Sequence, residues 1–220
     1  MAKKYTADEV IEMILDVSSS LFVSKGYEKT SIQDIVKGLD GLSRGAIYHH
    51  FESKQAIING VVRRFVPTEE ELDNIAAAKG LSGLEKIQKL LIDAMFNQKR
   101  SETLGSSYEL LNDAIFFSLY ITTMTEILSP YIEMFIEEGH VDGSVSAPFP
   151  RQIAEVIIML ISTWFINALY PNTAETFWEK LSACQYVLKQ CGVDVLSKEV
   201  LQTIMSNVES KVKEYEDKSN

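Results

Sequence analysis

The sequence contains little proline, glycine or cysteine, and each scarcity excludes a kind of structure. Only 5 prolines and 11 glycines occur in 220 residues, and no proline precedes Pro67. A fold of many short strands and tight turns needs more of both, so long helices are favoured. Cys184 and Cys191 are the only cysteines. On one helix they would lie roughly 10 Å apart, too far for a disulfide. We interpret them as small core residues in a reducing cytoplasm rather than as a redox pair.

Signals for secretion and membrane insertion are also missing. Met1–Tyr5 leads directly into a polar helix signal, so no secretory signal peptide is expected. The stretch from Val156 to Ala174 has no charged side chain, and its most apolar part ends at Tyr170. As a helix that part spans about 22 Å, short of the ~30 Å hydrocarbon core of a bilayer. We therefore expect a buried helix there, and a cytoplasmic protein with no membrane partner.

Catalytic and metal-binding patterns are absent as well. The chain has 3 histidines and 2 cysteines, and it contains no evident Ser-His-Asp set, metal-ligand cluster or glycine-rich phosphate loop. His49 and His50 are adjacent, so on a helix they point about 100° apart and cannot chelate one metal together. The sequence therefore predicts a protein that is not an enzyme and that has neither a metal nor a cofactor.

The acidic charge is confined to one part of the chain. The formal net charge is −10, but residues 1–66 contain 9 Lys and Arg against 8 Asp and Glu, and residues 67–220 contain 12 against 23. The two segments therefore carry +1 and −11. A near-neutral segment can still bind phosphate if its cations share one face, so the overall acidity does not exclude a nucleic-acid partner.

Capping signals divide the N-terminal segment into helices. Thr6-Ala-Asp-Glu9 is a capping box that predicts a first helix at Ala7–Lys25. A second box, Thr30-Ser-Ile-Gln33, opens a short helix before a turn at 39–42. 

Two further serines mark the helices that follow this turn. Ser43 caps a third helix, and Ser53 caps a fourth that reaches toward Ala78. Two short helices joined by a tight turn and packed on a longer one form a helix-turn-helix.

Helix signals continue through the second segment. Ser82-Gly-Leu-Glu85 is another capping box, and Pro130 is expected to bend or divide the helices around it. Residues 139–150 form the one clear long loop. Helices are expected at 82–100, 105–125, 126–138, 151–170, 174–191 and 197–216. The sequence thus predicts an all-α fold, with a three-helix helix-turn-helix domain at 1–66 joined to a larger helical domain at 67–220.

The third helix has two faces of different chemistry. Ile47, His50 and Phe51 fall on one side and can pack on the first helix. The other side offers a guanidinium for guanine edges or phosphate, a glycine that permits close backbone approach, and a phenol and an imidazole that can donate to phosphate. A recognition helix needs these parts in a major groove. The outward residues are Arg44, Gly45, Tyr48 and His49.

The fourth helix begins with another cation. The ammonium group of Lys54 and the helix N-terminus can clamp one phosphate together. Arg63 and Arg64 fit a solvated helix face better than a DNA contact.

The stretch SRGAIYHHFESK resembles the signature of the TetR/AcrR family, in which small residues precede an aromatic pair and a lysine follows the phenylalanine by three residues. The surrounding pattern also fits, with a long first helix, Phe22, Gly26-Tyr27 and Ile35. The resemblance covers residues 8–65, and the rest of the chain matches only in length and helical character.

The resemblance implies how the DNA contacts are divided. The residues at 30, 31 and 33 approach the DNA backbone or adjacent bases, those at 44 and 45 approach base edges, and those at 48, 49 and 54 hold phosphates. The segment GLDGL carries one residue more than typical members have before Ser43, so an unusual turn is expected. The predicted DNA-binding residues are Thr30, Ser31, Gln33, Ser43, Arg44, Gly45, Tyr48, His49 and Lys54.

The helix at 153–170 is apolar nearly all round, so it must be buried on all sides. One side can face its own core and the other a partner chain, and the next helix carries a second apolar stripe. Two such helices per protomer would form a four-helix, two-fold dimer interface, as the resemblance also implies. The predicted interface residues are Ile157, Ile161, Trp164, Phe165, Phe177, Leu181, Cys184 and Leu188.

Aromatic and methionine side chains recur among the helices at 84–136. They fit a ligand pocket, which the resemblance implies, although for any single residue an ordinary core position is the simpler interpretation. Glu109 and Asp113 nearby would suit a cationic lipophilic ligand, and surface acidity explains them equally well. The candidate pocket residues are Met95, Phe96, Tyr108, Phe116, Phe117, Tyr120 and Met124.

Together these features predict a ligand-responsive, sequence-specific transcriptional regulator. Its expected partners are a near-palindromic operator duplex, a second copy of the chain and an unidentified small-molecule effector. The ligand would bind a state that does not fit DNA, with the helix at 53–78 as the natural coupler, and repression is the family's commoner habit. The alternative is an architectural or protein-recruiting helix-turn-helix protein without a small-molecule ligand.

Overall fold

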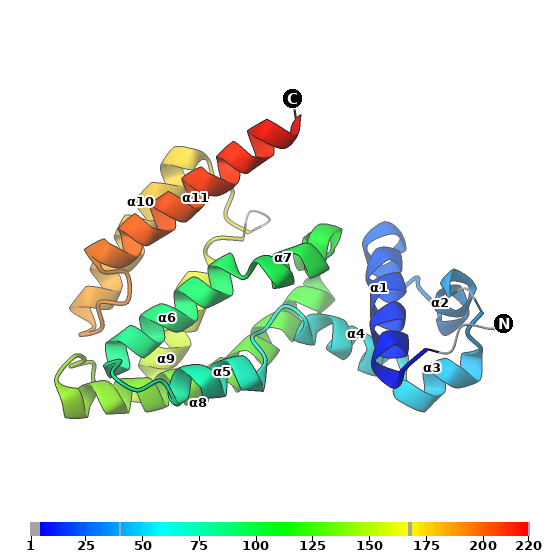
Figure 1. The fold of residues 1–220 in the computed structure, drawn as a ribbon, viewed down its shortest axis with the longest axis horizontal. Coiled ribbons are helices and arrows are strands. Elements are labelled where there is room, and N and C mark those ends of the chain that lie inside the picture. The colour runs from blue at the N-terminus through cyan, green and yellow to red at the C-terminus, as the bar shows by residue number, and fades with distance from the viewer. Residues whose placement is uncertain (1–4, 40, 167–168, 220) are drawn as a thin grey trace. The chain divides into compact units, whose positions relative to one another are not determined.

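The computed structural model describes residues 5–39, 41–166 and 169–219, which form helices and connecting turns without a β-strand (Figure 1). The all-α fold class is confirmed. The chain divides into two compact units: unit 1 comprises Met1–Val66 and Lys99–Thr123, and unit 2 comprises Pro67–Gln98 and Met124–Asn220. The division after Val66 falls at the predicted domain boundary. Lys99–Thr123, however, belongs to unit 1, although the predicted second domain includes it.

Side-chain caps set the starts of the N-terminal helices in unit 1. Thr6 Oγ1 accepts from the Glu9 amide at 3.2 Å, and the Glu9 carboxylate accepts from the Thr6 amide at 2.8 Å, so the predicted capping box is confirmed. Ser43 and Ser53 cap the third and fourth helices, as predicted. The helices are α1 (Ala7–Lys25), α2 (Ile32–Gly38), α3 (Arg44–His50) and α4 (Lys54–Arg63), followed later in the chain by α7 (Gln98–Leu104), the 3₁₀ helix η1 (Gly105–Asn112) and the start of α8 (Ala114–Asp142).

The core of unit 1 combines both of its chain segments. Phe65 and Phe116 are buried, and their rings meet edge to face with centroids 5.1 Å apart. Leu104 and Leu110 of the second segment are buried in the same cluster as Ile14 of α1. Burial of an apolar side chain of this size stabilises a fold by about 1.5–3 kcal/mol. The second segment is therefore a structural part of the N-terminal unit.

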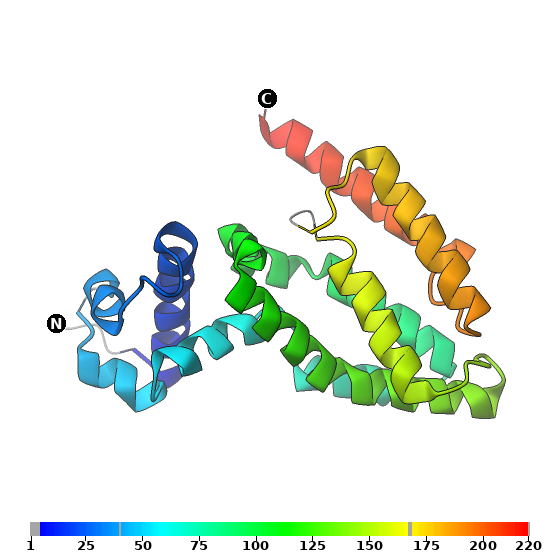
Figure 2. The same cartoon turned by 180° about the vertical axis from the view of Figure 1, so that it is seen from behind.

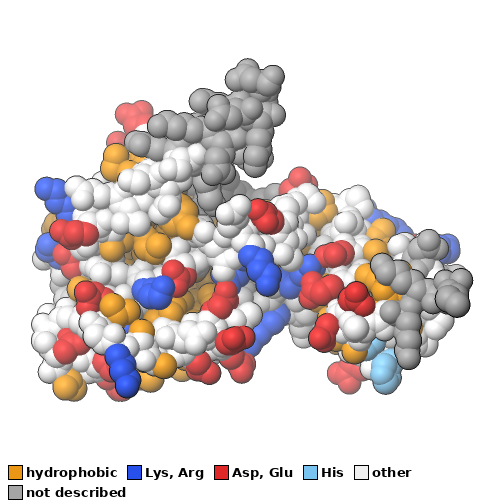
Figure 3. Space-filling model, in the orientation of Figure 1, with side chains coloured by type: hydrophobic (Ala, Val, Ile, Leu, Met, Phe, Trp, Pro, Cys, Tyr) orange, Lys and Arg blue, Asp and Glu red, His pale blue; other side chains and the backbone are white. Residues whose placement is uncertain are grey.

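Unit 2 contains the remaining helices of the chain, which are seen from behind in Figure 2. The predicted helix at 174–191 is confirmed, and the predicted helix at 151–170 is a shorter helix followed by a π-helical turn. Acidic, basic and apolar side chains are interspersed on the face of this unit that Figure 3 shows. Its elements are α5 (Glu69–Ala76), α6 (Gly83–Phe96), the larger part of α8, α9 (Pro150–Ile158), the π-helical turn η2 (Met159–Thr163), α10 (Ala174–Gln190) and α11 (Lys198–Ser219).

Two prolines act differently from what the sequence predicts. The single helix expected from 53 to 78 is wrong, because α4 ends at Arg63 and α5 begins only at Glu69. Pro67 has no amide hydrogen to continue the helix, and Thr68 caps the new one. Pro130, in contrast, does not divide its helix, since it lies inside α8. Its side chain is exposed, so water can hydrogen-bond the carbonyl group that the proline leaves unpaired.

By length and composition alone, α8 could cross a membrane, with a mean hydropathy of 1.2 over an 18-residue window. The core helix of a soluble protein passes the same test, so one such helix is weak evidence. Phe116, Phe135 and Ile136 of α8 are fully buried within the protein. Part of the apolar surface of α8 is therefore buried within the protein, although only 28% of the apolar window is buried.

The start of α6 lies directly against the end of α8. The Gly83 amide donates to Asp142 Oδ2 at 2.8 Å, and the Leu84 amide donates to Ser144 Oγ at 3.2 Å. Hydrogen bonds from Ser144 and Gly83 hold the pKa of the Asp142 carboxyl below its ordinary value. A Cβ atom on Gly83 would lie 2.1 Å from the Phe135 carbonyl oxygen and 2.3 Å from the Gly139 nitrogen. Only glycine permits this approach of two helix backbones.

The substitution Gly83→Ala tests this packing. Alanine ordinarily stabilises a helix relative to glycine by about 0.5–1 kcal/mol, but here its methyl group would meet backbone that cannot move aside. We expect the free energy of unfolding to fall by about 1–3 kcal/mol, the range for overpacking, in chemical denaturation. Gly45→Ala is the control, since its Cβ would meet only Ser43 Oγ at 3.6 Å. Equal or greater stability of the Gly83 variant would contradict the close approach.

Candidate functional site

The outer face of α3 presents the side chains that the sequence predicts for it. Arg44, Gly45, Tyr48 and His49 are exposed, whereas Ile47 is fully buried. Arg44 Nη2 donates to Tyr48 Oη at 3.3 Å, and the guanidinium carbon lies 5.4 Å from the centre of the tyrosine ring. The two outward side chains thus lie together one helical turn apart, with donors available for base edges or phosphates.

Gly45 is not required by the packing of the chain itself. The position is exposed and helical, and a Cβ there would make only an ordinary contact. A glycine within a helix is destabilising by roughly 0.5–1 kcal/mol relative to alanine. Since nothing inside the protein uses the free space, the glycine fits a surface that another molecule approaches closely.

Lys54 lies at the junction of α4 with the turn between α1 and α2. Its Nζ donates to the carbonyl oxygens of Tyr27 at 2.8 Å, Thr30 at 3.0 Å and Glu28 at 3.3 Å. It also lies 4.3 Å from the centre of the Tyr27 ring. An ammonium group has three donors, so these carbonyls use all of them. In this geometry Lys54 positions the turn, and it can bind a phosphate directly only by giving up one of these bonds.

Thr30 and the start of α2 differ from the prediction. The N-cap is Ser31, one residue later than the predicted box, and Asp34 is its reciprocal partner. Thr30 is buried, and its hydroxyl donates to Gly26 O at 2.8 Å and Leu21 O at 3.3 Å, so it faces away from any DNA. We therefore reassign Thr30 from DNA contact to holding the α1–α2 turn.

The carboxylate of Asp34 reinforces this corner. Hydrogen bonds from Lys25, at 2.7 Å, and from Ser31 hold its pKa far below the ordinary value. Gln33 is exposed on α2 and remains a candidate contact. In the turn that follows α2, Gly41 has a φ of 79°. Asp40, which belongs to the segment with the predicted extra residue, lies outside the described residues.

Cations near the recognition helix fall into two groups. Lys29 and Lys37 are exposed on the α1–α2 turn and on α2. Arg64 is instead held by carboxylates of α1, with Nη2 at 2.6 Å from Asp16 and 3.0 Å from Glu12. Its ion pairs support a structural role, and the lysines remain available for phosphates.

The predicted pocket residues do not form one group. Phe116, Tyr120 and the exposed Tyr108 surround Phe65 in unit 1, and burial raises the pKa of Tyr120 to about 12. Phe117 is in the same unit, while Met95 and Phe96 end α6 in unit 2. Of the predicted set, only Met124 lines the cavity of unit 2.

That cavity is apolar and lies among α6, α8, α9 and η2. It has a volume of about 60 Å³, and the one polar residue in its described lining is Ser162. The Ser162 hydroxyl is turned away, since it donates to the Ile158 carbonyl. Aliphatic side chains at i, i+3 and i+4 spacing build the walls, among them Leu90, Leu91, Met124, Leu128, Ile157 and Ile161. In the sequence these apolar side chains have the spacing of an ordinary core. The cavity beside them results from the way in which the helices pack.

The predicted dimer residues also separate into two groups. Leu181, Cys184 and Leu188 are buried within unit 2, so they cannot form an interface while the protomer keeps this packing. Burial raises the pKa of the Cys184 thiol to about 11, and Cys191 is only partly buried. Their spacing on α10 fits an intramolecular core as well as a dimer, and the sequence does not distinguish the two.

Of the other predicted interface residues, all except Ile157 are more accessible. Trp164, Phe165 and Phe177 are partly buried in an aromatic cluster, whereas Ile157 is buried beside the cavity. Ile161 is partly buried and also lines the cavity. Exposed residues missed in the prediction are Met159, Tyr186 and Val187.

The chain is similar to known regulators in sequence and in fold. Residues 14–61 match the family described as bacterial regulatory proteins, tetR family. The transcriptional repressor KstR2 of Rhodococcus jostii is 23% identical over 144 residues, which cover 64% of this chain and 70% of that protein. The Staphylococcus aureus regulator IcaR, a negative regulator of a biofilm operon, is 22% identical over 72% of this chain and 84% of its own length. The crystal structure of NalD from Pseudomonas aeruginosa has the same fold, with a TM-score of 0.60, 17% identity, and coverage of 84% of this chain and 96% of that one.

Two substitutions separate positioning from contact in the helix-turn-helix. Lys54→Met removes a cation that serves several carbonyl groups, so we expect a loss of about 1.5–3 kcal/mol in unfolding free energy, together with weaker DNA binding. Tyr48→Phe is the matched comparison and should weaken DNA binding without a loss of stability. Chemical denaturation and binding to a labelled duplex measure the two effects. An unchanged stability of the Lys54 variant would show that the lysine acts only on DNA.

Gly45→Ala is expected to have the opposite signature. The variant should be as stable as the parent or more so, by up to about 1 kcal/mol, yet bind its preferred duplex at least about tenfold more weakly, because the added methyl group occupies the space of a closely approaching base edge. Fluorescence anisotropy of the labelled duplex measures the affinity. Unchanged affinity would show that the glycine face does not enter the groove.

Proposed function

Because the chain belongs to the TetR family of bacterial regulatory proteins and is a DNA-binding transcriptional regulator, we propose that it is a repressor that an uncharged lipophilic molecule releases from a near-palindromic operator. Both curated relatives described above are named as a repressor or a negative regulator. The observation that carries the ligand class is the apolar cavity of unit 2. Regulators of this family are soluble, and we propose the cytoplasm as the location of this one.

The exposed face of α3 supports operator binding. Arg44, Gly45, Tyr48 and His49 are exposed, and the family resemblance implies that the first two approach base edges and the last two hold phosphates. Ser31 and Ser43 cap the two short helices, and both are exposed. A protein with one recognition helix reads one half-site, so a palindrome needs two copies.

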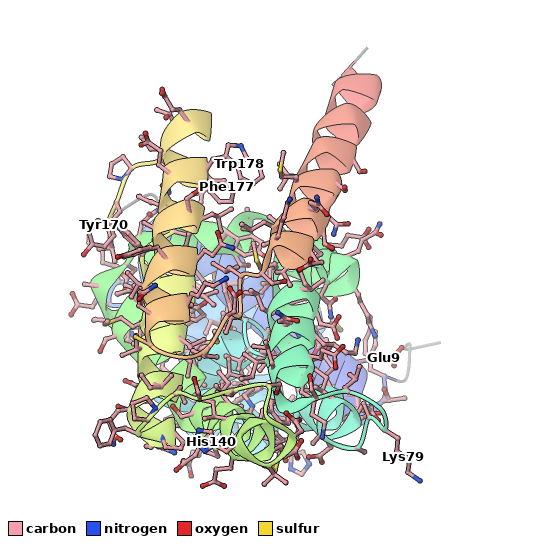
Figure 4. The ribbon with its side chains drawn as sticks, turned by 90° about the vertical axis from the view of Figure 1, so that its left-hand side faces the viewer. Glu9, Lys79, His140, Tyr170, Phe177 and Trp178 are labelled. Carbon is pink, nitrogen blue, oxygen red and sulfur yellow. The ribbon has the colours of Figure 1, made fainter. Side chains whose placement is uncertain are left out.

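Exposed apolar side chains around η2 and α10 support a homodimer. Met159 is 56% exposed and Tyr186 is 68% exposed, and both are large enough to anchor an interface. Figure 4 shows Tyr170 on one side of α10, and Phe177 and Trp178 projecting from α10 on the other side, where α11 lies. We propose that η2 and the exposed surface of α10 pair across a two-fold axis, with two recognition helices one turn of DNA apart or somewhat more.

The chemistry of the cavity selects the effector. Its described lining contains no charged side chain. Moving an ionised group into such a site costs several kcal/mol, because nothing there replaces its hydration. Glu109 and Asp113 do not offset this cost, since Glu109 is exposed in unit 1 and Asp113 Oδ1 accepts from the amides of Ile115 and Phe116 at the start of α8. We therefore replace the hypothesis of a cationic ligand, which was based on Glu109 and Asp113, with that of an uncharged ligand.

A series of ligands with one chain length and three charges tests this proposal. A preferred duplex is first selected from a random DNA pool, and N-phenyl-1-naphthylamine serves as an uncharged fluorescent probe of the cavity. We expect 1-decanol to displace the probe, and to release the duplex, at concentrations at least about tenfold below those of decanoate or decylamine. Ala94→Leu, which fills the cavity from α6, should abolish probe binding and leave DNA binding intact.

Two outcomes would contradict the proposal in different ways. Tighter binding of either ion than of decanol would mean that a charged group outside the cavity recognises the effector. If all three compounds leave the duplex bound, and if the selected pool shows no preferred sequence at higher salt, the architectural alternative is the correct one.

A further inference from the structure

The π-helical turn η2 lies between the effector cavity and the aromatic cluster at the proposed dimer surface. We propose that η2 is the moving wall of the cavity. This inference rests on the proposed effector site and adds how occupancy of that site changes the dimer.

η2 adjoins the cavity on its N-terminal side and the aromatic cluster on its C-terminal side. On the N-terminal side, Ile157 and Ile158 of α9 line the cavity together with Ile161 and Ser162 of the turn. On the C-terminal side, Trp164 follows the turn directly and begins a chain of ring contacts. The centroid distances are 6.5 Å from Trp164 to Phe165, 5.5 Å from Phe165 to Phe177 and 5.3 Å from Phe177 to Trp178.

The turn is the part of the wall that can change most easily. A π-helical turn contains an extra residue relative to an α-helix and occurs mostly as a single turn at functional sites. The Ser162 hydroxyl donates to the carbonyl of Ile158, four residues earlier, where an α-helix would place an amide hydrogen bond. Serines inside the regular helices α1, α10 and α11 make the same bond, and a carbonyl oxygen has two lone pairs, so this bond is compatible with either form of the segment.

The other walls are held more firmly. α6 and α8 are joined by an ion pair with a buried lysine, in which Lys86 Nζ lies 2.6 Å from Glu138 and donates to Ala76 O at 2.8 Å. The cavity volume of about 60 Å³ is far below the roughly 300 Å³ that drug-sized ligands need. A lipophile of decanol size therefore enters only if a wall moves, and η2 is the wall without such a tie among the residues that the structure describes.

The movement has a defined consequence for the aromatic cluster. Each residue of an α-helix turns the chain by about 100°. Conversion of η2 to an α-helical turn therefore rotates Phe165 relative to Ile157 and Ile158, and it separates Phe165 from Phe177. Since these rings lie at the proposed dimer surface, occupancy of the cavity is linked to the geometry with which two copies pair.

Removing the extra residue tests the role of the turn. A variant lacking Leu160, which does not line the cavity, should have an α-helix in place of η2. We expect it to bind N-phenyl-1-naphthylamine at least about threefold more tightly than the parent does, because the cavity wall then starts in its moved position. Release of the selected duplex by 1-decanol, which should weaken DNA binding at least about tenfold in the parent, should fall below about twofold.

The tryptophans provide a direct readout, because the 2 in the chain are Trp164 and Trp178, on either side of the ring contacts. Decanol should shift tryptophan emission in the parent and in Trp178→Phe, and the shift should be lost in the variant lacking Leu160. A deletion variant that binds the probe and still releases DNA as the parent does, or a parent whose tryptophan emission does not change when decanol binds, would overturn the inference while leaving the proposed function intact. Failure of the parent to bind the probe would instead reject the effector site, and the inference with it.

Discussion

The recognition surface depends on one ammonium group that satisfies the turn between α1 and α2. Lys54 Nζ donates to the carbonyl oxygens of Tyr27, Glu28 and Thr30, and so ties the first turn of α4 to the residues that precede α2. Backbone carbonyls in a tight turn lack helical partners and must be satisfied by another donor. With this tie in place, α2 and α3 have a fixed start, and α3 can bury Ile47 and present Arg44 and Tyr48 outward. The lysine therefore contributes to DNA binding chiefly through the shape that it maintains.

A second constraint, the burial of enough apolar surface, explains why unit 1 extends beyond the helix-turn-helix. The helices α1 to α4 bury limited apolar surface by themselves, and small domains are correspondingly marginal. Lys99–Thr123 completes the unit, with Leu104, Leu110 and Phe116 buried against residues of the N-terminal segment. The resemblance to a known family ends before this second segment, because the signature describes the DNA-reading helices and not the residues that support them.

Helix starts were predictable where the relevant contact is local. The caps formed by Thr6, Ser43, Ser53 and Ser82 involve amides three residues later in the chain, and each is present. The prediction was one residue wrong at Thr30, because its hydroxyl bonds to carbonyls of the preceding helix and leaves the cap to Ser31. It was also wrong about the helix through Pro67 and about a break at Pro130. Whether Pro130 breaks its helix depends on the exposure of the proline to water, which the sequence does not specify.

The sequence alone determined the helical class, the two-faced recognition helix and the family resemblance, because periodicity, caps and a short motif are all local properties. Only the tertiary structure decided which apolar residues face inward. Leu181, Cys184 and Leu188 have the spacing of an interface and lie in the core, while four helices meet around a small cavity that no single stripe reveals. The reason is physical: an apolar side chain needs to be removed from water, and many partners satisfy that need equally well. The choice among those partners is made by helix packing, where contacts between residues distant in the chain outweigh local preference.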